Sequence, residues 1–218
     1  QAEVDTYDTT RVLMGIHPSC FDWKLAPGES FQTPEAVISY TDQGLNGLSR
    51  NFHRLYQKRL ARGYWRDRER PILINNWEAT YFDFNEEEIL NIAQKAKECG
   101  VELFVLDDGW FGARNTERAG LGDWYVNQDK LPARISGLAE KIENMGMKFG
   151  LWFEPEMVNE DSDLFRAHPD WIIRTPGRET SYGRHQLVLD FSRKEVVDHI
   201  YEMMAKILSE AKISYVKW

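Results

Sequence analysis

The sequence predicts an α/β chain that forms the first half of a (β/α)8 barrel, preceded by the end of a β-sandwich. Apolar runs at 103–110, 149–156 and 214–218 each contain a Trp and charged residues at or near their ends. Helical patterns separate these runs, as they do in parallel α/β sheets. Chemistry at the carboxyl ends of strands is typical of barrel enzymes. Because the last such run is only the fourth barrel strand, we expect the chain to be part of a longer barrel.

Three segments follow from the change in pattern along the chain. Residues 1–44 show alternation at 21–25, a turn at 26–29 and a further strand pattern at 33–40, and are expected to be the C-terminal end of an N-terminal β-sandwich domain. Residues 45–70 are expected to form a linker helix, because their apolar residues take up helical spacing. Residues 71–218 are expected to form the N-terminal half of the catalytic barrel.

The barrel segment divides into alternating strands and helices. Strands are expected at 71–77, 101–106, 147–153 and 213–218, because parallel strands buried on both faces are nearly continuously apolar. A capping box of Asn85 and Glu88 should begin the first helix, and Gly100 should end it. The second helix is expected at 132–145. Ser192 and Glu195 have the spacing of another capping box, which would open the third helix.

Composition narrows the functional class. The net charge of −8 argues against nucleic acid as a partner. The sequence contains no run of about 18 apolar residues, so it predicts no membrane-spanning helix. Cys20 and Cys99 are expected to be free thiols in a reducing, cytoplasmic compartment. Metal-binding histidine motifs, nucleotide-binding glycine motifs and a serine-hydrolase elbow are missing from the sequence, so we expect no metal and no cofactor.

Asp107 and Asp108 follow the predicted strand 101–106 and are the first candidates for a functional site. Successive side chains of a strand point to opposite faces, so both can reach one ligand only if the strand end bends, which Gly109 permits. Adjacent carboxylates could bind a metal, transfer protons or accept hydrogen bonds from vicinal hydroxyls. Asp-Asp-Gly is also ordinary loop sequence.

Further charged and aromatic candidates lie at the other strand ends. Glu154 and Glu156 could form a carboxylate pair for glycoside chemistry, but we favour a role in holding an Arg or Lys. Trp152 could stack on a sugar or fill the core. Lys217 could pair with a carboxylate of a neighbouring strand or donate to substrate hydroxyls, and Arg184 by its loop position alone reads as a surface charge.

These segments together resemble glycoside hydrolase family 36, the bacterial-type α-galactosidases. The resemblance rests on Trp23 to Ala36, on Phe52 to Tyr56 and on the four strand ends Pro71–Trp77, Leu106–Gly112, Gly150–Met157 and Tyr215–Trp218. It covers essentially the whole chain. It implies that the first segment ends a β-supersandwich and that the enzyme is a retaining glycosidase, often a homo-oligomer such as a tetramer.

The resemblance also implies roles for individual residues. The family's nucleophile directly follows its Tyr-Val-Lys-Trp motif, and its acid/base aspartate lies further on, so no catalytic carboxylate is expected before Trp218. Asp107 and Asp108 would accept hydrogen bonds from galactose hydroxyls. The other substrate-binding residues it implies are Trp77, Trp152, Arg184 and Lys217. The expected function is hydrolysis of terminal α-galactosides such as melibiose and raffinose, with the 218-residue chain inactive alone.

Three alternatives stay open on the sequence. A galactosyl transferase of the raffinose-synthase kind would share the galactose pocket. A non-catalytic galactoside-binding module would need no nucleophile. A metal-dependent barrel enzyme would use Asp107, Asp108 and Glu154 as ligands.

Overall fold

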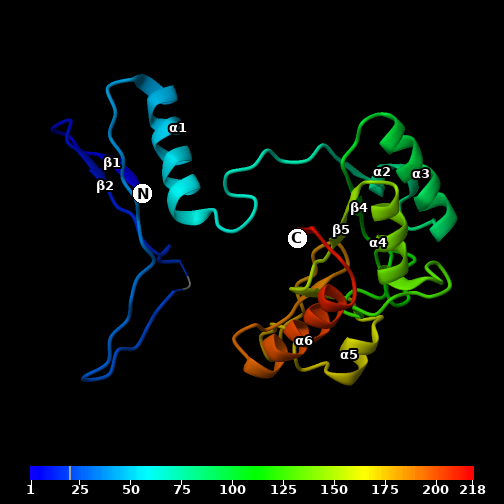
Figure 1. Ribbon diagram of the computed structural model, residues 1–218. Coiled ribbons are helices and arrows are strands. Elements are labelled where there is room, and N and C mark those ends of the chain that lie inside the picture. Colours follow the sequence, from blue (N-terminus) through cyan, green and yellow to red (C-terminus); the bar gives the residue numbers. More distant parts are fainter. Residues whose placement is uncertain (20) are drawn as a thin grey trace. The chain divides into compact units, whose positions relative to one another are not determined.

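Figure 1 shows the computed structural model of the chain, which describes residues 1–19 and 21–218. The chain divides into two compact units, Gln1–Glu69 and Arg70–Trp218, and each is described by itself. Cys99 is an exposed free thiol, as expected, whereas the expectation for Cys20 lies outside the described residues. Among the residues that the structure describes, no helix is long and apolar enough to cross a bilayer.

The first unit contains little regular structure before its helix. Strands β1 (Ala2–Val4) and β2 (Thr10–Val12) pair antiparallel, and α1 (Gly44–Leu55) continues into a π-helical segment, η1 (Tyr56–Leu60). The helix predicted for 45–70 is therefore present, but it ends at Leu60 and residues 61–70 are not helical. The strands predicted at 21–25 and 33–40 are wrong, because a strand needs a neighbour and only β1 and β2 pair within the described part of this unit. Trp23 and Val37, in those two segments, are largely exposed.

The second unit is built on a parallel sheet of four strands. Its order is β3 (Leu73–Asn75), β4 (Leu103–Leu106), β5 (Lys148–Trp152) and β8 (Tyr215–Lys217). All three pairings are parallel, so the carboxyl ends of the four strands lie together on the same side of the sheet. This sheet confirms the four predicted strands and agrees with part of a (β/α)8 barrel.

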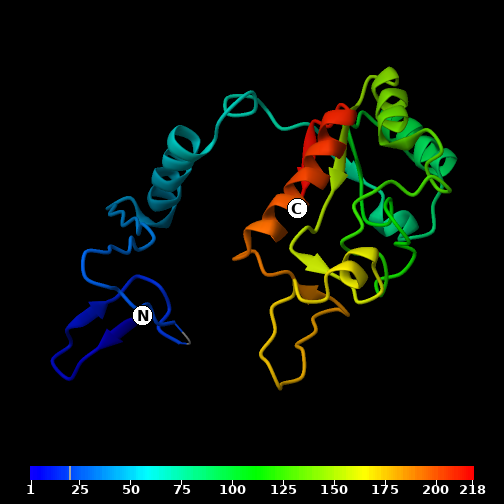
Figure 2. The same ribbon diagram turned by 90° about the horizontal axis from the view of Figure 1, so that it is seen from below.

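A long helix follows each of the first three strands of this sheet. These helices are α3 (Glu86–Glu98), α4 (Arg134–Asn144) and α6 (Lys194–Glu210), and α4 packs against both of the others. Figure 2 shows α6 running beside the sheet in a second view. The capping box of α3 is confirmed, since Asn85 and Glu88 each accept a hydrogen bond from the other's backbone N–H, both at 3.1 Å.

The capping box predicted for α6 is wrong. The helix begins after Arg193, and no side chain caps it. The Glu195 carboxylate pairs with the Arg193 guanidinium at 2.7 Å, so it does not turn back to the backbone of Ser192. The Ser192 hydroxyl donates to Asp190 at 2.6 Å instead.

Four short elements were not predicted. They are α2 (Trp77–Thr80), α5 (Asp163–Ala167), and the antiparallel pair β6 (Met157–Val158) and β7 (Leu187–Val188). The N-terminus of α5 is capped by the local Ser162 hydroxyl and by the distant Asp123 carboxylate, which accept its first backbone N–H groups at 3.0 Å. Short elements of this kind follow from contacts made far along the chain.

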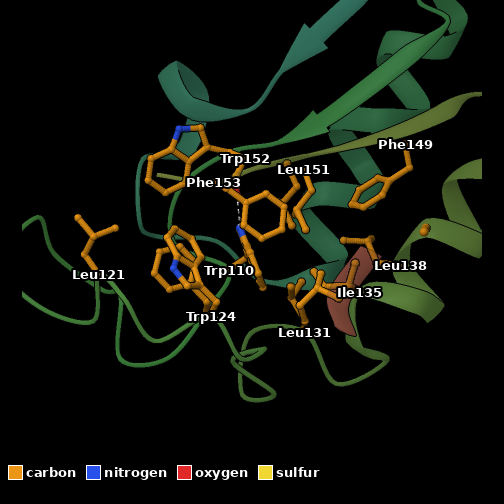
Figure 3. Packing of buried hydrophobic residues seen from close by; sticks show 14 of the residues in the cluster. Trp110, Leu121, Trp124, Leu131, Ile135, Leu138, Phe149, Leu151, Trp152 and Phe153 are labelled. Carbon is orange, nitrogen blue, oxygen red and sulfur yellow. Dashed lines mark hydrogen bonds between the residues drawn. The ribbon is translucent and has the colours of Figure 1, made fainter. Parts of the chain in front are cut away.

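A hydrophobic core lies between the sheet, its helices and the loop after β4. Figure 3 shows the rings of Trp110, Trp124, Trp152 and Phe153 gathered in this core. The Trp110 indole N–H donates to the Trp152 carbonyl at 3.0 Å, which fixes the loop after β4 against the end of β5. The strand ends that carry polar side chains therefore rest on a packed aromatic layer.

Candidate functional site

Polar side chains converge at the carboxyl edge of the parallel sheet. Leu106 of β4 pairs with Leu151 of β5, so the next residue, Asp107, lies level with Trp152. Trp152 pairs with Lys217 of β8, which places Asp107 and Lys217 at the same level of the sheet. Sheet strands lie about 4.8 Å apart, so β4 and β8, on either side of β5, lie about 10 Å apart. A long side chain from β8 can still span that gap.

Asp107 is the centre of this group. It is 3% exposed, and Lys217 Nζ lies 2.5 Å from its Oδ2. The Asn75 side-chain amide donates to the same oxygen, and the Asp108 backbone N–H donates to Oδ1 at 2.8 Å. The Asn76 side chain in turn accepts the Asp107 backbone N–H at 2.8 Å. The carboxylate is thus held from three strands, and Lys217 reaches across β5.

Asp108 is bound by a buried guanidinium. Arg114 Nε and Nη2 donate to its two carboxylate oxygens at 2.9 and 2.8 Å, which is the bidentate geometry that arginine favours. The two side chains are 1% and 6% exposed. Each carboxylate oxygen keeps a lone pair for a further donor. Asp107 and Asp108 consequently have different partners, although they are adjacent.

The chain bends after this pair, as the sequence led us to expect. Gly109 has a φ of +102°, and a Cβ there would lie 3.1 Å from the Phe84 ring. Lys130 Nζ donates to the carbonyls of Gly109 at 3.0 Å and Phe82 at 2.7 Å. Burial lowers the pKa of Lys130, while the Asp108 charge opposes that shift. The bend is therefore fixed by a half-buried cation.

Arg184 lies in a two-residue turn near the β6–β7 pair. Gly183 and Gln186 exchange both backbone hydrogen bonds, at 3.1 and 2.9 Å, around Arg184 and His185. Arg184 Nη1 lies 3.7 Å from Glu154 Oε1, and Gln186 donates to Glu154 at 3.1 Å. Burial raises the pKa of Glu154, and the Arg184 charge acts in the opposite direction. Glu154 thus lies within ion-pair distance of an arginine, as favoured from the sequence, whereas Glu156 accepts a hydrogen bond from the Trp218 indole at 2.9 Å.

The two candidate tryptophans lie in different surroundings. Trp77 begins α2 and is half-buried, and its ring packs edge-on against Tyr81 and Phe82 at 5.2 and 5.0 Å. Its backbone N–H donates to Asn75 at 2.7 Å, which links it to the partners of Asp107. Trp152 is 9% exposed and lies within the aromatic core, parallel to Phe111 at 6.1 Å.

The structure brings some of the predicted residues together directly. Asp107 and Lys217 form an ion pair, and Asp108 is joined to Asp107 through its backbone. Arg184 is connected to Glu154, with 71% of its side chain exposed. Their roles toward a substrate stay predictions.

Sequence reasoning missed the residues that hold the candidates in place. Asn75 and Asn76 end a strand, Arg114 and Lys130 lie in a polar loop, and Asn159 follows a short strand. Such positions usually carry solvated side chains, and only their contacts distinguish them. Among the described residues, no group of three or more His, Cys, Asp or Glu side chains is placed to hold a metal ion.

Comparison with known proteins gives the same picture over the whole chain. Alpha-galactosidase AgaA of Geobacillus stearothermophilus is 61% identical over 218 residues, and Mel36A of Lactobacillus acidophilus is 49% identical. The crystal structure of the GH36 alpha-galactosidase AgaB of G. stearothermophilus superposes with a TM-score of 0.96 at 61% identity. An AgaA variant solved in complex with raffinose also superposes with a TM-score of 0.96, at 60% identity.

These matches cover all of this chain and about 30% of each of those proteins. The chain therefore spans less than a third of the length of its relatives. The Melibiase family model matches residues 30–218. This match and the full-length identities show that the chain belongs to the Melibiase family, glycoside hydrolase family 36.

Proposed function

We propose that this chain forms one side of the galactose pocket of an α-galactosidase that hydrolyses terminal α-galactosides such as raffinose and melibiose. The observation that carries the proposal is the Asp107 group: a buried carboxylate at the strand ends with a lysine 2.5 Å away. Carboxylates and ammonium groups fixed in this way accept from and donate to adjacent sugar hydroxyls. The names of the relatives support the same substrate class.

In this proposal each candidate binds the sugar without performing the covalent step. Asp107 and Asp108 accept hydrogen bonds from galactose hydroxyls, while Lys217 and Arg184 donate to them. Trp77 and Trp152 bound the pocket. The nucleophilic aspartate directly follows Trp218, and the acid/base aspartate comes from a later strand, with about 5–5.5 Å between the carboxyl groups of a retaining enzyme.

We further propose that the longer protein acts in the cytoplasm as a homo-oligomer. Its partner is the galactoside, and it binds neither nucleic acid nor a membrane. The net charge of −8 supports the first of these exclusions.

The test uses the longer protein that contains this chain. We expect it to hydrolyse a chromogenic α-galactoside and to leave the matching β-galactoside intact. NMR of the first-formed sugar should show α-galactose, because two displacements retain the configuration. β-Galactose as the first product contradicts retention, and cleavage of neither substrate contradicts the proposed function.

A further inference from the structure

Asn159 is a buried amide that uses its whole hydrogen-bonding capacity. It is 0% exposed and lies between β6 and α5. Its Oδ1 accepts from Arg114 Nη1 at 2.9 Å and from the Leu121 backbone at 3.0 Å. Its Nδ2 donates to the carbonyls of Glu117 at 3.2 Å and His185 at 2.8 Å. A carboxamide has two donors and two accepting lone pairs, and all four are used here.

One side of this amide contacts the partner of Asp108. Arg114 donates from Nε and Nη2 to the two oxygens of Asp108, and from Nη1 to Asn159 and to the Ala119 carbonyl. Arg114 is fully buried, so the three side chains form one solvent-free chain of contacts. A change in the position of Asn159 is therefore passed to the guanidinium and to the carboxylate.

The other side of the amide contacts the turn that presents Arg184. The His185 carbonyl accepts from Asn159, while Arg184 and His185 have φ values of +55° and +61°. Residues other than glycine are disfavoured in this left-handed region. Such a conformation persists when surrounding contacts over-determine it. The bond from Asn159 is one such contact and comes from outside the turn.

We propose that Asn159 is a positioning residue that couples the Asp108–Arg114 pair to the Arg184 turn, so that both reach the galactoside in a fixed relation. The inference rests on the proposed function for the roles of Asp108 and Arg184. It assigns Asn159 no contact with the substrate. Its effect passes through Arg114 on one side and through the His185 carbonyl on the other.

Asn159→Asp is the sharpest variant, because it keeps the shape of the side chain. The oxygen that replaces Nδ2 would face the carbonyl oxygens of Glu117 and His185, so both hydrogen bonds would be replaced by repulsion. In the longer protein, we expect kcat/KM for an α-galactoside to fall about 10- to 100-fold, the scale of losses caused by small displacements in a site.

A double-mutant cycle with Arg184→Ala separates positioning from general damage. If Asn159 couples the two sides, Asn159→Asp should cost at least threefold less when Arg184 is already removed, because only the effect through Arg114 then remains and coupled residues are non-additive. An equal factor in both backgrounds overturns the inference. Asn127→Asp is the matched control: Asn127 is half-buried and bonds the Gly112 carbonyl at 3.0 Å, and its cost should be the same with and without Arg184.

A second readout does not depend on activity. Hydrogen exchange of the Gly183 and Gln186 amides should be about tenfold faster in Asn159→Asp and unchanged in Asn127→Asp. Unchanged exchange in Asn159→Asp overturns the inference, whatever the activity of the native protein. Failure of the native protein to cleave an α-galactoside contradicts only the proposed function. If Asn159→Asp does not fold, Arg114→Lys replaces it in the exchange readout alone, because one ammonium cannot reproduce the fork that binds both Asp108 and Asn159, and its kinetics would also report the direct loss at Asp108.

Discussion

Asp108 has a structural role as well as its proposed contact with the sugar, because it neutralises a buried guanidinium. We expect Asp108→Asn to lower the free energy of unfolding by about 3–5 kcal/mol, since Arg114 would be left as an uncompensated buried charge. It should also lower kcat/KM. Urea midpoints and steady-state kinetics of the longer protein measure the two effects.

Asp107→Asn is the matched control for that experiment. The partner of Asp107 is Lys217, whose side chain is 43% exposed and can turn to solvent. The loss of stability should therefore be about 1 kcal/mol, as for other partly exposed pairs. Equal losses for the two variants would show that burial of Arg114 does not determine the cost.

Glu154 should make stability depend on pH. Burial raises the pKa of its carboxyl, so the ionised form is less favourable in the folded protein than in the unfolded one. The native protein thus loses stability as pH rises from the ordinary carboxyl range through the raised pKa. Relative to native, Glu154→Gln should be more stable at pH 7 than at pH 4.

Urea midpoints at the two pH values give that difference. Glu179→Gln, in the exposed segment after Gly177, is the control for removing one negative charge from the same region. If Glu154→Gln is less stable relative to native at pH 7 than at pH 4, burial is not the main cause of the raised pKa.

At the scale of elements, the turn between Gly183 and Gln186 holds two residues in a backbone conformation that glycine tolerates better. We expect His185→Gly to stabilise the turn by about 1 kcal/mol, because it removes the left-handed strain and keeps the carbonyl that Asn159 binds. Amide exchange at Gly183 and Gln186 should slow by about fivefold, the factor that corresponds to this energy.

Glu179→Gly provides the comparison for this turn. Glu179 is exposed and does not have a positive φ, so glycine relieves no strain there. Its only expected effect is a small loss of stability, because the unfolded chain becomes more flexible. Exchange should not slow in that variant. Faster exchange in His185→Gly would show that the His185 side chain itself supports the turn, for example through Glu117, 3.6 Å away.

At the scale of the molecule, the four-stranded sheet has an unpaired edge at β3 and another at β8. The neighbouring face of α6 exposes Val197, Tyr201 and Leu208, and with Trp218 they line an apolar groove. Open edges and exposed apolar side chains favour association. We therefore expect the 218-residue chain, expressed alone, to form oligomers or aggregates without α-galactosidase activity.

Size-exclusion chromatography with light scattering tests this expectation. Replacing Val197 and Leu208 by Glu should shift the isolated chain toward monomer, whereas Glu substitutions at two exposed polar positions of α6, Lys206 and Ser209, should change little. A native isolated chain that is monomeric and cleaves an α-galactoside would contradict the prediction.

The sequence predicted the parts of the molecule whose pattern is set by burial. Strand β4 is apolar throughout and β5 is apolar after Lys148, and α3 carries both its capping box and its buried stripe. The β6–β7 pair could not be predicted, since its two strands are about 30 residues apart in sequence and pair only in the folded chain, and α5, beyond its local Ser162 cap, depends on the distant Asp123. The same limit applied at 21–25 and 33–40, where alternation exists without a neighbouring strand.

The charged residues of the candidate site at the strand ends could be predicted from the sequence. The buried loop residues that hold them in place could not. Asp107 and Lys217 stand out because charge at the end of an apolar strand is unusual. Arg114 and Asn159 occupy loop positions where polar residues are common, and only their complete burial sets them apart. Burial of a loop side chain depends on the tertiary fold, which local sequence does not encode.

The Asp107–Lys217 pair also bears on the order in which the chain folds during synthesis. Its members are 110 residues apart, so closing that distance costs more entropy than pairing β4 with β5. Synthesis proceeds from the N-terminus, and β3, β4 and β5 leave the ribosome before β8 does. A nascent chain therefore holds Asp107 without its counter-charge, and the ion pair marks the moment at which this half of the pocket is complete.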